Sequence, residues 1–72
     1  MHYKLLVNVI EIYSSKNDPH PKFYSKTDLV DFKIENKSRV ILSFKSLGRV
    51  YNYSFEDVNS QEITALRDFF GL

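Results

Sequence analysis

Residues 29–56 read LVDFKIENKSRVILSFKSLGRVYNYSFE, and this stretch decides the fold. Apolar and polar residues alternate through most of it, which is typical of strands that bury one face. A three-residue loop at Asn36, Lys37 and Ser38 and a two-residue turn at Leu47-Gly48 divide it into three strands. The expected strands of this antiparallel meander are Leu29 to Glu35, Ser38 to Ser46 and Arg49 to Glu56.

The two turns set a register in which apolar residues lie opposite each other. The pairs expected in the first hairpin are Ile34 with Val40, Phe32 with Leu42, and Val30 with Phe44. Those expected in the second hairpin are Phe44 with Tyr51, Leu42 with Tyr53, and Val40 with Phe55. A slip of one residue would move polar side chains onto the apolar face. We therefore expect Leu42 at the centre of the core and Ser43 on the opposite, solvent-facing side.

The N-terminal part of the chain is expected to contribute one long strand and one long loop. Tyr3 to Tyr13 is rich in aromatic and β-branched residues and contains neither Gly nor Pro, which favours a strand. Ser14 to Asp28 contains two prolines, which favours a loop. Within this loop Phe23 and Tyr24 either cover the core as a lid or are exposed for a partner.

The C-terminal segment carries the signals of one amphipathic helix. Asn59 and Glu62 have the spacing of a capping box, and Val58 with Ile63 has that of a hydrophobic staple. Gly71 is a natural end for the helix. The apolar stripe of this helix is expected at Ile63, Leu66, Phe69 and Phe70. Its expected target is the apolar sheet face at Val40, Leu42, Phe44, Tyr51 and Tyr53.

These elements predict one α+β domain over residues 1–72. Its four-stranded antiparallel sheet would contain the long first strand and, after the long loop, the three-strand meander, with the helix packed on one face. The alternative is a small SH3-like barrel with a C-terminal helix, in which the first strand closes against the last. A domain this small has a thin stability margin, and without Cys it has no disulfide to compensate. We therefore expect it to form a homo-oligomer.

Composition and charge argue for a cytoplasmic, non-enzymatic protein. Charged residues make up 26% of the chain and its net charge is +1, which is ordinary for a globular protein. The apolar start, residues 1–12, is too short to span a membrane. His2 and His20 lie far apart, and the two Gly residues cannot build a phosphate-binding loop, so we expect no metal, no cofactor and no catalytic site. The low Ala and Gly content with much Asn, Lys and Ile indicates an AT-rich genome, such as a low-GC bacterium or its phage.

The leading functional hypothesis is a protein-interaction or regulatory module that self-associates. The expected first strand is apolar on both faces, and a few apolar residues also fall on the polar face of the meander. Together they would form an exposed patch of the kind that marks protein interfaces. The candidate interface residues are Leu6, Ile10, Ile12, Leu29, Ile41 and Val50. The competing interpretation is that the first strand bends and buries these residues itself.

The alternative hypothesis is nucleic-acid binding by the basic hairpin at residues 37–49 and the basic loop at residues 14–28. Basic patches with interleaved aromatic residues bind phosphates and stack on bases. The candidate contacts are Lys37, Arg39, Lys45, Arg49, Lys22 and Lys26. Two observations weaken this hypothesis. Tyr51 and Tyr53 are expected to face the core, and Glu35 and Glu56 flank Arg39 in the expected register. No motif in the chain identifies a known family.

Overall fold

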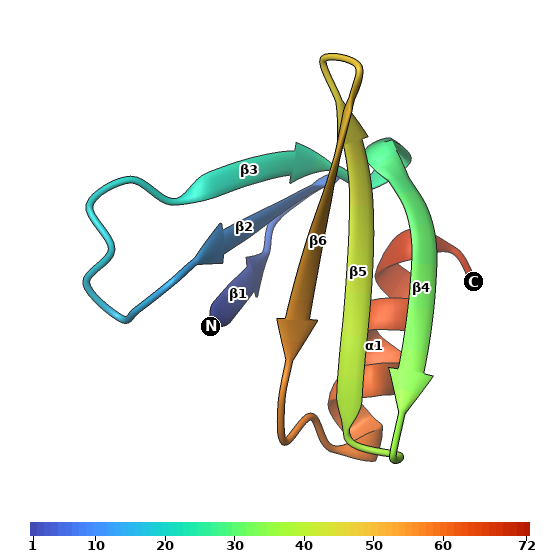
Figure 1. Cartoon of the computed structure of the whole chain (residues 1–72). Coiled ribbons are helices and arrows are strands. Elements are labelled where there is room, and N and C mark those ends of the chain that lie inside the picture. Colours follow the sequence, from blue (N-terminus) through green and yellow to red (C-terminus); the bar gives the residue numbers. More distant parts are fainter.

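The protein contains two three-stranded antiparallel sheets and one α-helix, an α+β arrangement (Figure 1). The computed structural model describes all residues, 1–72. The first sheet has the strand order β1-β2-β3 and the second the order β4-β5-β6. The elements are β1 (His2–Leu5), β2 (Val9–Tyr13), β3 (Lys22–Ser25), the 3-10 helix η1 (Lys26–Asp28), β4 (Leu29–Glu35), β5 (Arg39–Ser46), β6 (Arg49–Phe55) and α1 (Ser60–Phe70).

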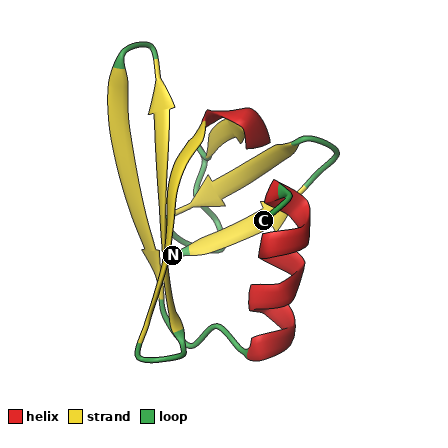
Figure 2. Ribbon diagram, turned by 90° about the vertical axis from the view of Figure 1, so that its right-hand side faces the viewer, coloured by secondary structure: helices red, strands yellow, loops and turns green.

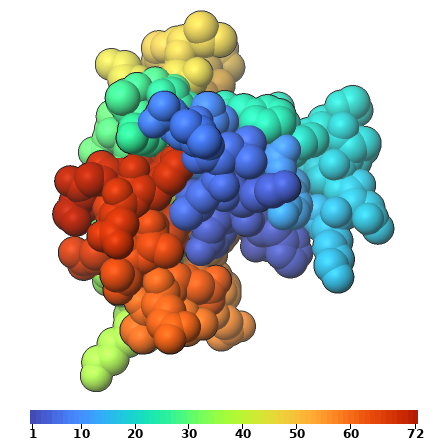
Figure 3. Space-filling view, turned by 180° about the vertical axis from the view of Figure 1, so that it is seen from behind, coloured from blue at the N-terminus to red at the C-terminus, as the bar shows by residue number.

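The elements form two layers. The second sheet is one layer, and the first sheet and α1 lie side by side on its inner face to form the other (Figures 2 and 3). Phe44, on the central strand β5, is contacted from both halves of this second layer. The ring of Tyr24 from β3 stacks on Phe44 at 4.6 Å between centroids, and Phe70 from α1 lies at 6.0 Å. The two halves of the chain therefore share one core.

Nine buried apolar residues make up this core. They come from both sheets, from α1 and from the segment before it, so no single element provides a core of its own. The core residues are Ile10, Ile12, Tyr24, Val40, Leu42, Phe44, Phe55, Val58 and Leu66.

The predicted register of the meander is confirmed in the second hairpin and in most of the first. Five of the six predicted pairs are present, including Leu42 with both Phe32 and Tyr53. The sixth is wrong, because a bulge shifts the register between Leu29 and Asp31, so that Leu29 rather than Val30 lies opposite Phe44. The bulge leaves Val30 exposed and directs Leu29 to the core.

Backbone conformation explains why the two predicted turns have these lengths. Leu47 and Gly48 have φ of 53° and 77°, the pair of positive values that a two-residue hairpin turn requires. In the first turn Asn36 and Lys37 are also left-handed, with φ of 51° and 63°. The twist of these turns matches that of the flanking strands, which keeps the apolar residues on one face.

The predicted helix is confirmed with its capping signals. The Asn59 side chain accepts a hydrogen bond from the backbone N–H of Glu62 at 2.8 Å, and Glu62 accepts one from the N–H of Asn59 at 3.3 Å. Gly71 ends the helix in the left-handed region with φ of 75°. The helix covers the β4–β5 side of the inner face, where Phe70 meets Phe32, whereas Tyr24 of the first sheet covers the part that carries Tyr51 and Tyr53.

The single long strand predicted at residues 3–13 is wrong, because the chain reverses direction within it. β1 and β2 form a tight hairpin in which the N–H of Leu6 donates to the carbonyl of Val9 at 2.8 Å. Asn8 adopts a left-handed conformation with φ of 64°. Asn tolerates this conformation better than most residues, so a turn forms here without Gly or Pro.

The long loop predicted at residues 14–28 is also wrong in its second half. Residues 22–25 form β3, which pairs with β2, and residues 26–28 form η1. Of the predicted loop, only residues 14–21 lie outside regular secondary structure. There Asp18 accepts hydrogen bonds from the backbone N–H groups of Ser14 and His20, which lower the pKa of its carboxyl group.

The predicted four-stranded sheet is therefore overturned, and so is the barrel alternative. Splitting the first strand and adding β3 produces a separate three-stranded sheet instead of one strand for the meander. A barrel would require the first strand to pair with the last, but β1 pairs only with β2 and β6 pairs only with β5. The two sheets contact each other through side chains and do not join through a shared ladder.

Candidate functional site

β6 has an edge whose backbone groups have no partner. Ser46 and Arg49 flank the two-residue turn and form a hydrogen-bonded pair. Along an antiparallel ladder, hydrogen-bonded pairs alternate with pairs that are not hydrogen-bonded. Arg49, Tyr51, Tyr53 and Phe55 thus direct their backbone N–H and C=O groups to β5. The alternate residues direct theirs away from the sheet, and no backbone hydrogen bond outside the ladder engages them. We call these outward-facing groups, those of Val50, Asn52 and Ser54, the β6 edge.

The β6 edge lacks the features that normally prevent a strand from pairing with another chain. Natural edges are protected by charged side chains, Pro, bulges or short length. β6 is seven residues long and regular, and from Val50 to Phe55 it contains neither a charged residue nor Pro. The side chain of Val50 is 55% exposed. This edge is therefore competent to accept a further strand.

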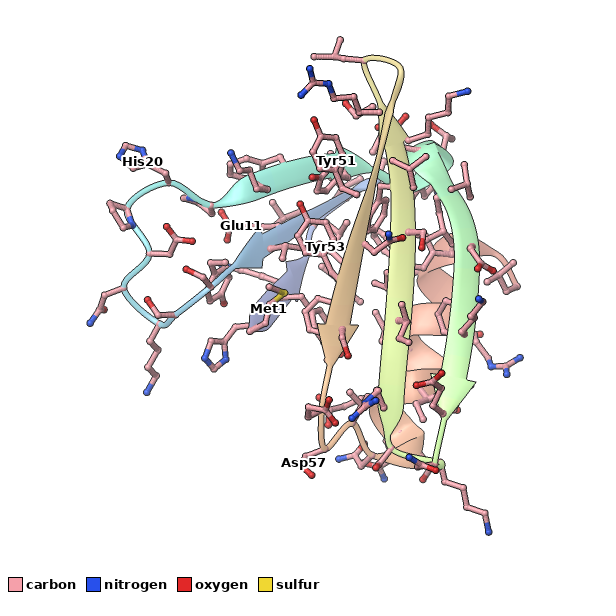
Figure 4. The ribbon with its side chains drawn as sticks, in the orientation of Figure 1. Met1, Glu11, His20, Tyr51, Tyr53 and Asp57 are labelled. Atoms are coloured by element: carbon pink, nitrogen blue, oxygen red, sulfur yellow. The ribbon has the colours of Figure 1, made fainter.

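A groove of about 210 Å³ lies between β3 and β6. Tyr51 and Tyr53 extend from β6 on the side that faces the first sheet (Figure 4). The rim is apolar, with Phe23 56% and Tyr51 38% exposed. The residues that line this depression, which we call the β6 groove, are Lys22, Phe23, Tyr24, Ser46, Tyr51 and Tyr53. Its lining contains one cation and no carboxylate.

Tyr24 forms a rigid wall of the β6 groove. Its ring is buried and stacked on Phe44, and its hydroxyl shares a hydrogen bond with that of Tyr53. Burial, and then the hydrogen bond with Tyr53, raise the pKa of Tyr24 well above its ordinary value. The Tyr24 hydroxyl is therefore neutral over the physiological pH range, and its hydrogen bond with Tyr53 joins the first sheet to the second at the groove.

A larger depression of about 420 Å³ lies where β1, the end of β6 and the start of α1 meet. Tyr3 packs edge-to-face against Phe55 there, with centroids 5.2 Å apart. Burial, and then the nearby carboxylate of Glu62, raise the pKa of Tyr3. On the other side His2 stacks with Tyr13. The β6 groove is the stronger candidate, although smaller, because it combines exposed aromatic side chains with the β6 edge.

The six predicted interface residues do not form one patch. Ile10 and Ile12 are core residues, and Leu29 packs against the core. This agrees with the competing interpretation, in which the first part of the chain bends and buries its own apolar residues. Leu6 is partly exposed beside the β1–β2 turn, and Ile41 is half-buried on β5. Of the six, only Val50 belongs to the β6 edge.

The six predicted nucleic-acid contacts are distributed over separate places. Lys37 lies in the β4–β5 loop, at the opposite end of β5 from Lys45 (Figure 1). Arg39 is near Lys37, and its guanidinium pairs with Glu56 at 2.8 Å and Glu35 at 3.4 Å. The remaining residues divide between η1, which holds Lys26, and the surroundings of the β6 groove. Lys22 lines that groove, and Arg49 pairs with its lining residue Ser46.

Sequence reasoning missed the β6 groove because its two walls lie far apart in the chain. The expectation that Phe23 and Tyr24 act together is replaced by a division of roles. Tyr24 covers the core, as in the lid interpretation, and Phe23 remains exposed, as in the partner interpretation. The two adjacent aromatic residues, Phe23 and Tyr24, favour a strand and are the local signal that could have found β3. Tyr51 was expected in the core but lies at the rim.

No group of three His, Asp or Glu side chains is close enough to hold a metal ion. None of the helices has the length and apolar character needed to cross a membrane. Comparison of the chain with protein-family models, curated proteins and solved structures finds no match.

Proposed function

We propose that this protein is a protein-interaction module that binds its partner by adding a strand of the partner to β6. The observation that carries the proposal is the β6 edge, a regular and uncharged row of backbone groups without partners. Strand addition is a general mode of peptide recognition, in which main-chain hydrogen bonds supply affinity and pockets for alternate side chains supply specificity. Here the β6 groove supplies those pockets.

The groove lies where alternate side chains of an added strand would point. A strand beside β6 would run about 4.8 Å from it, and every second side chain would point towards the first sheet. Phe23 and Tyr51 form the exposed rim on that side. Apolar side chains of the partner would cover these two rings and remove their surface from water. The proposed role is binding and not catalysis, because its central feature is backbone pairing capacity.

Two valines with the same exposure provide a matched test. Val50 lies on β6 and is 55% exposed, and Val30 lies on β4, at the opposite edge of the same sheet, and is 56% exposed. A lysine at a strand edge opposes pairing because its charge would have to be desolvated. We expect Val50→Lys to abolish binding of an added strand and Val30→Lys to leave it unchanged.

The probe for this test is a library of random displayed peptides, selected on the intact protein. The selected peptides should bind the Val30→Lys variant and fail to bind the Val50→Lys variant. In the NMR spectrum of the wild-type protein they should shift the amide signals of Val50, Asn52 and Ser54. Peptides that bind both variants equally well would show that the β6 edge is not the binding site.

Nucleic-acid binding is a second candidate, with one observation in its favour. The lining of the β6 groove includes the cation Lys22 and the aromatic residues Phe23, Tyr24, Tyr51 and Tyr53, and Arg49 lies opposite the lining residue Ser46. Phosphates and stacked bases require this combination of groups. A labelled oligothymidine should then bind at low salt and dissociate as salt increases. Absence of binding at low salt would eliminate this candidate.

A further inference from the structure

A second copy of the folded protein meets a steric obstacle at the β6 edge. In a symmetric antiparallel pair of β6 strands, the two-fold axis is perpendicular to the sheet, so both first sheets lie on the same face. β2, β3 and the loop that joins them extend past β6 on that face, and the loop stands clear of the rest of the molecule (Figures 1 and 3). The two first sheets would therefore occupy the same space.

A symmetric parallel pair avoids this overlap but meets an electrostatic obstacle. Its two-fold axis runs along the strands, so each residue lies opposite its own copy. Arg49 at the start of β6, which takes part in no ion pair, would face the Arg49 of the second copy. Like charges directly opposite each other destabilise a strand pair.

An extended segment meets neither obstacle, because it brings no second layer. It would lie in the space beside β6, in front of the projecting first sheet. The charges along the edge indicate what such a segment should carry. The start of β6 is basic, with Arg49 next to the turn and Lys22 in the groove, and neither takes part in an ion pair. The end carries Glu56, whose carboxylate pairs with Arg39 at 2.8 Å, and Asp57, which takes part in no ion pair, so its uncompensated charge is the negative one of Asp57 (Figure 4).

We infer that the occupant of the β6 edge is an extended peptide segment of another protein, antiparallel to β6, with a basic residue towards its amino end and an acidic residue towards its carboxyl end. This inference rests on the proposed function and specifies its partner. The antiparallel direction is chosen because antiparallel pairs are the more stable per residue. In that direction the acidic residue lies near Arg49 and Lys22, and the basic residue near Glu56 and Asp57. Apolar residues between them alternate towards the β6 groove.

Two fluorescent peptides of equal composition test this inference by anisotropy with the full chain. The first alternates valine and serine between a lysine at its amino end and a glutamate at its carboxyl end. In the second the lysine and glutamate exchange places. We expect the second peptide to bind about fivefold more weakly, as partly desolvated charge pairs give way to like-charge contacts. Equal affinity for the two peptides would overturn the charge assignment.

Charge reversal in the protein provides the matched arm. Arg49→Glu should weaken binding of the first peptide and strengthen binding of the second. The ratio of the first affinity to the second should therefore fall or invert. Such a change of preference cannot come from a folding defect, which would weaken both. The control, Lys33→Glu, makes the same charge change on β4, the opposite edge of the sheet, and should leave the ratio unchanged. An equal effect of the two variants would contradict the inference.

Sedimentation of the wild-type chain distinguishes failure of the inferred partner from failure of the proposed strand addition. A monomer across the concentration range agrees with an extended partner. A dimer that Val50→Lys dissociates and Val30→Lys preserves would overturn the inference and keep strand addition, with a second copy as the partner. Library peptides could bind only when Val50 is intact while neither charged peptide binds. In that case the inferred positions of the basic and acidic residues are wrong and the proposed function stands.

Discussion

β4 and β6 are the two edges of one sheet, they are both seven residues long, and each exposes one valine to the same extent. They differ in how they are protected. β4 carries a bulge at Val30, and charged residues follow at alternate positions, Asp31, Lys33 and Glu35. β6 is regular, and its outward positions after Val50 hold only Asn52 and Ser54. The two valines are therefore equally exposed, and capacity for backbone pairing is the property that separates their positions.

The comparison of β4 with β6 assumes that both strands unfold together as parts of one cooperative sheet. The largest expected effect, that of Leu42→Ala on stability, tests this assumption. Leu42 is buried on the central strand and lies opposite both Phe32 and Tyr53. Leu42→Ala removes apolar contacts and leaves a cavity, so we expect it to cost about 2–5 kcal/mol of unfolding free energy. Urea denaturation measures this loss. Hydrogen exchange should show β4 and β6 losing protection together, and loss in one strand alone would contradict a single cooperative unit.

The control for this prediction is Ser43→Ala, on the opposite face of the same strand. The sequence suggests a neutral position, but the structure gives Ser43 an exposure of only 8% and a hydrogen bond to the side chain of Asn52. We therefore expect a loss of about 1 kcal/mol, the usual net worth of one hydrogen bond. It should remain clearly smaller than the loss at Leu42.

Replacing two of the three charged residues on β4 reduces the difference between the edges. Asp31→Thr combined with Lys33→Thr leaves the bulge and replaces both charges with residues that favour strands. The ion pair between these two side chains is exposed, with 3.6 Å between Nζ and the carboxylate oxygen, so its loss should change stability little. We expect the variant to self-associate at lower concentration than the wild type in sedimentation velocity. Unchanged sedimentation would show that the bulge and Glu35 are enough to protect this edge.

A third and smaller effect concerns the tyrosine pair in the β6 groove, which has no counterpart beside β4. Because folding raises the pKa of Tyr24, the folded state resists its ionisation. Its contribution to stability is complete below the ordinary tyrosine pKa of about 10, and it is lost as pH rises above that value, where the unfolded chain ionises first. Thermal unfolding followed at increasing alkaline pH should show this decline, and Tyr24→Phe should make it shallower. An identical decline in that variant would place the effect elsewhere, with Tyr3 the next candidate.

The sequence predicts the elements whose side chains alternate or repeat clearly. The second hairpin follows from apolar residues on β5 and β6 that only one register brings together, and the helix follows from Asn59, Glu62 and Gly71. The errors occur where backbone conformation, not side-chain pattern, decides the path. Asn8 turns the chain inside an apolar run, and the bulge at Val30 shifts the register by one residue without changing the pattern of the flanking strand.

The candidate site could be predicted only in part. Val50 is one of the few apolar residues on the polar face of the meander, and this identifies it as unusual before the structure is known. That β6 is an edge depends on which strand lies beside it, and this is a property of the whole topology. The β6 groove requires β3, four residues long and preceded by Pro21, to pair with β2 and face Tyr51. Local sequence does not encode such a meeting of distant segments.

The shared core also has a consequence for the order in which a ribosome delivers this chain. Synthesis begins at the N-terminus, so Ile10 and Ile12 emerge well before Phe44 and Leu66, with which they form the core. An isolated hairpin such as β1–β2 is only marginally stable in water. The nascent first sheet therefore cannot pack its apolar side chains until β5 has left the exit tunnel. A translational pause before that point would leave residues 1–25 unfolded and sensitive to proteases, so the first sheet acquires its structure only after β5 has been synthesised.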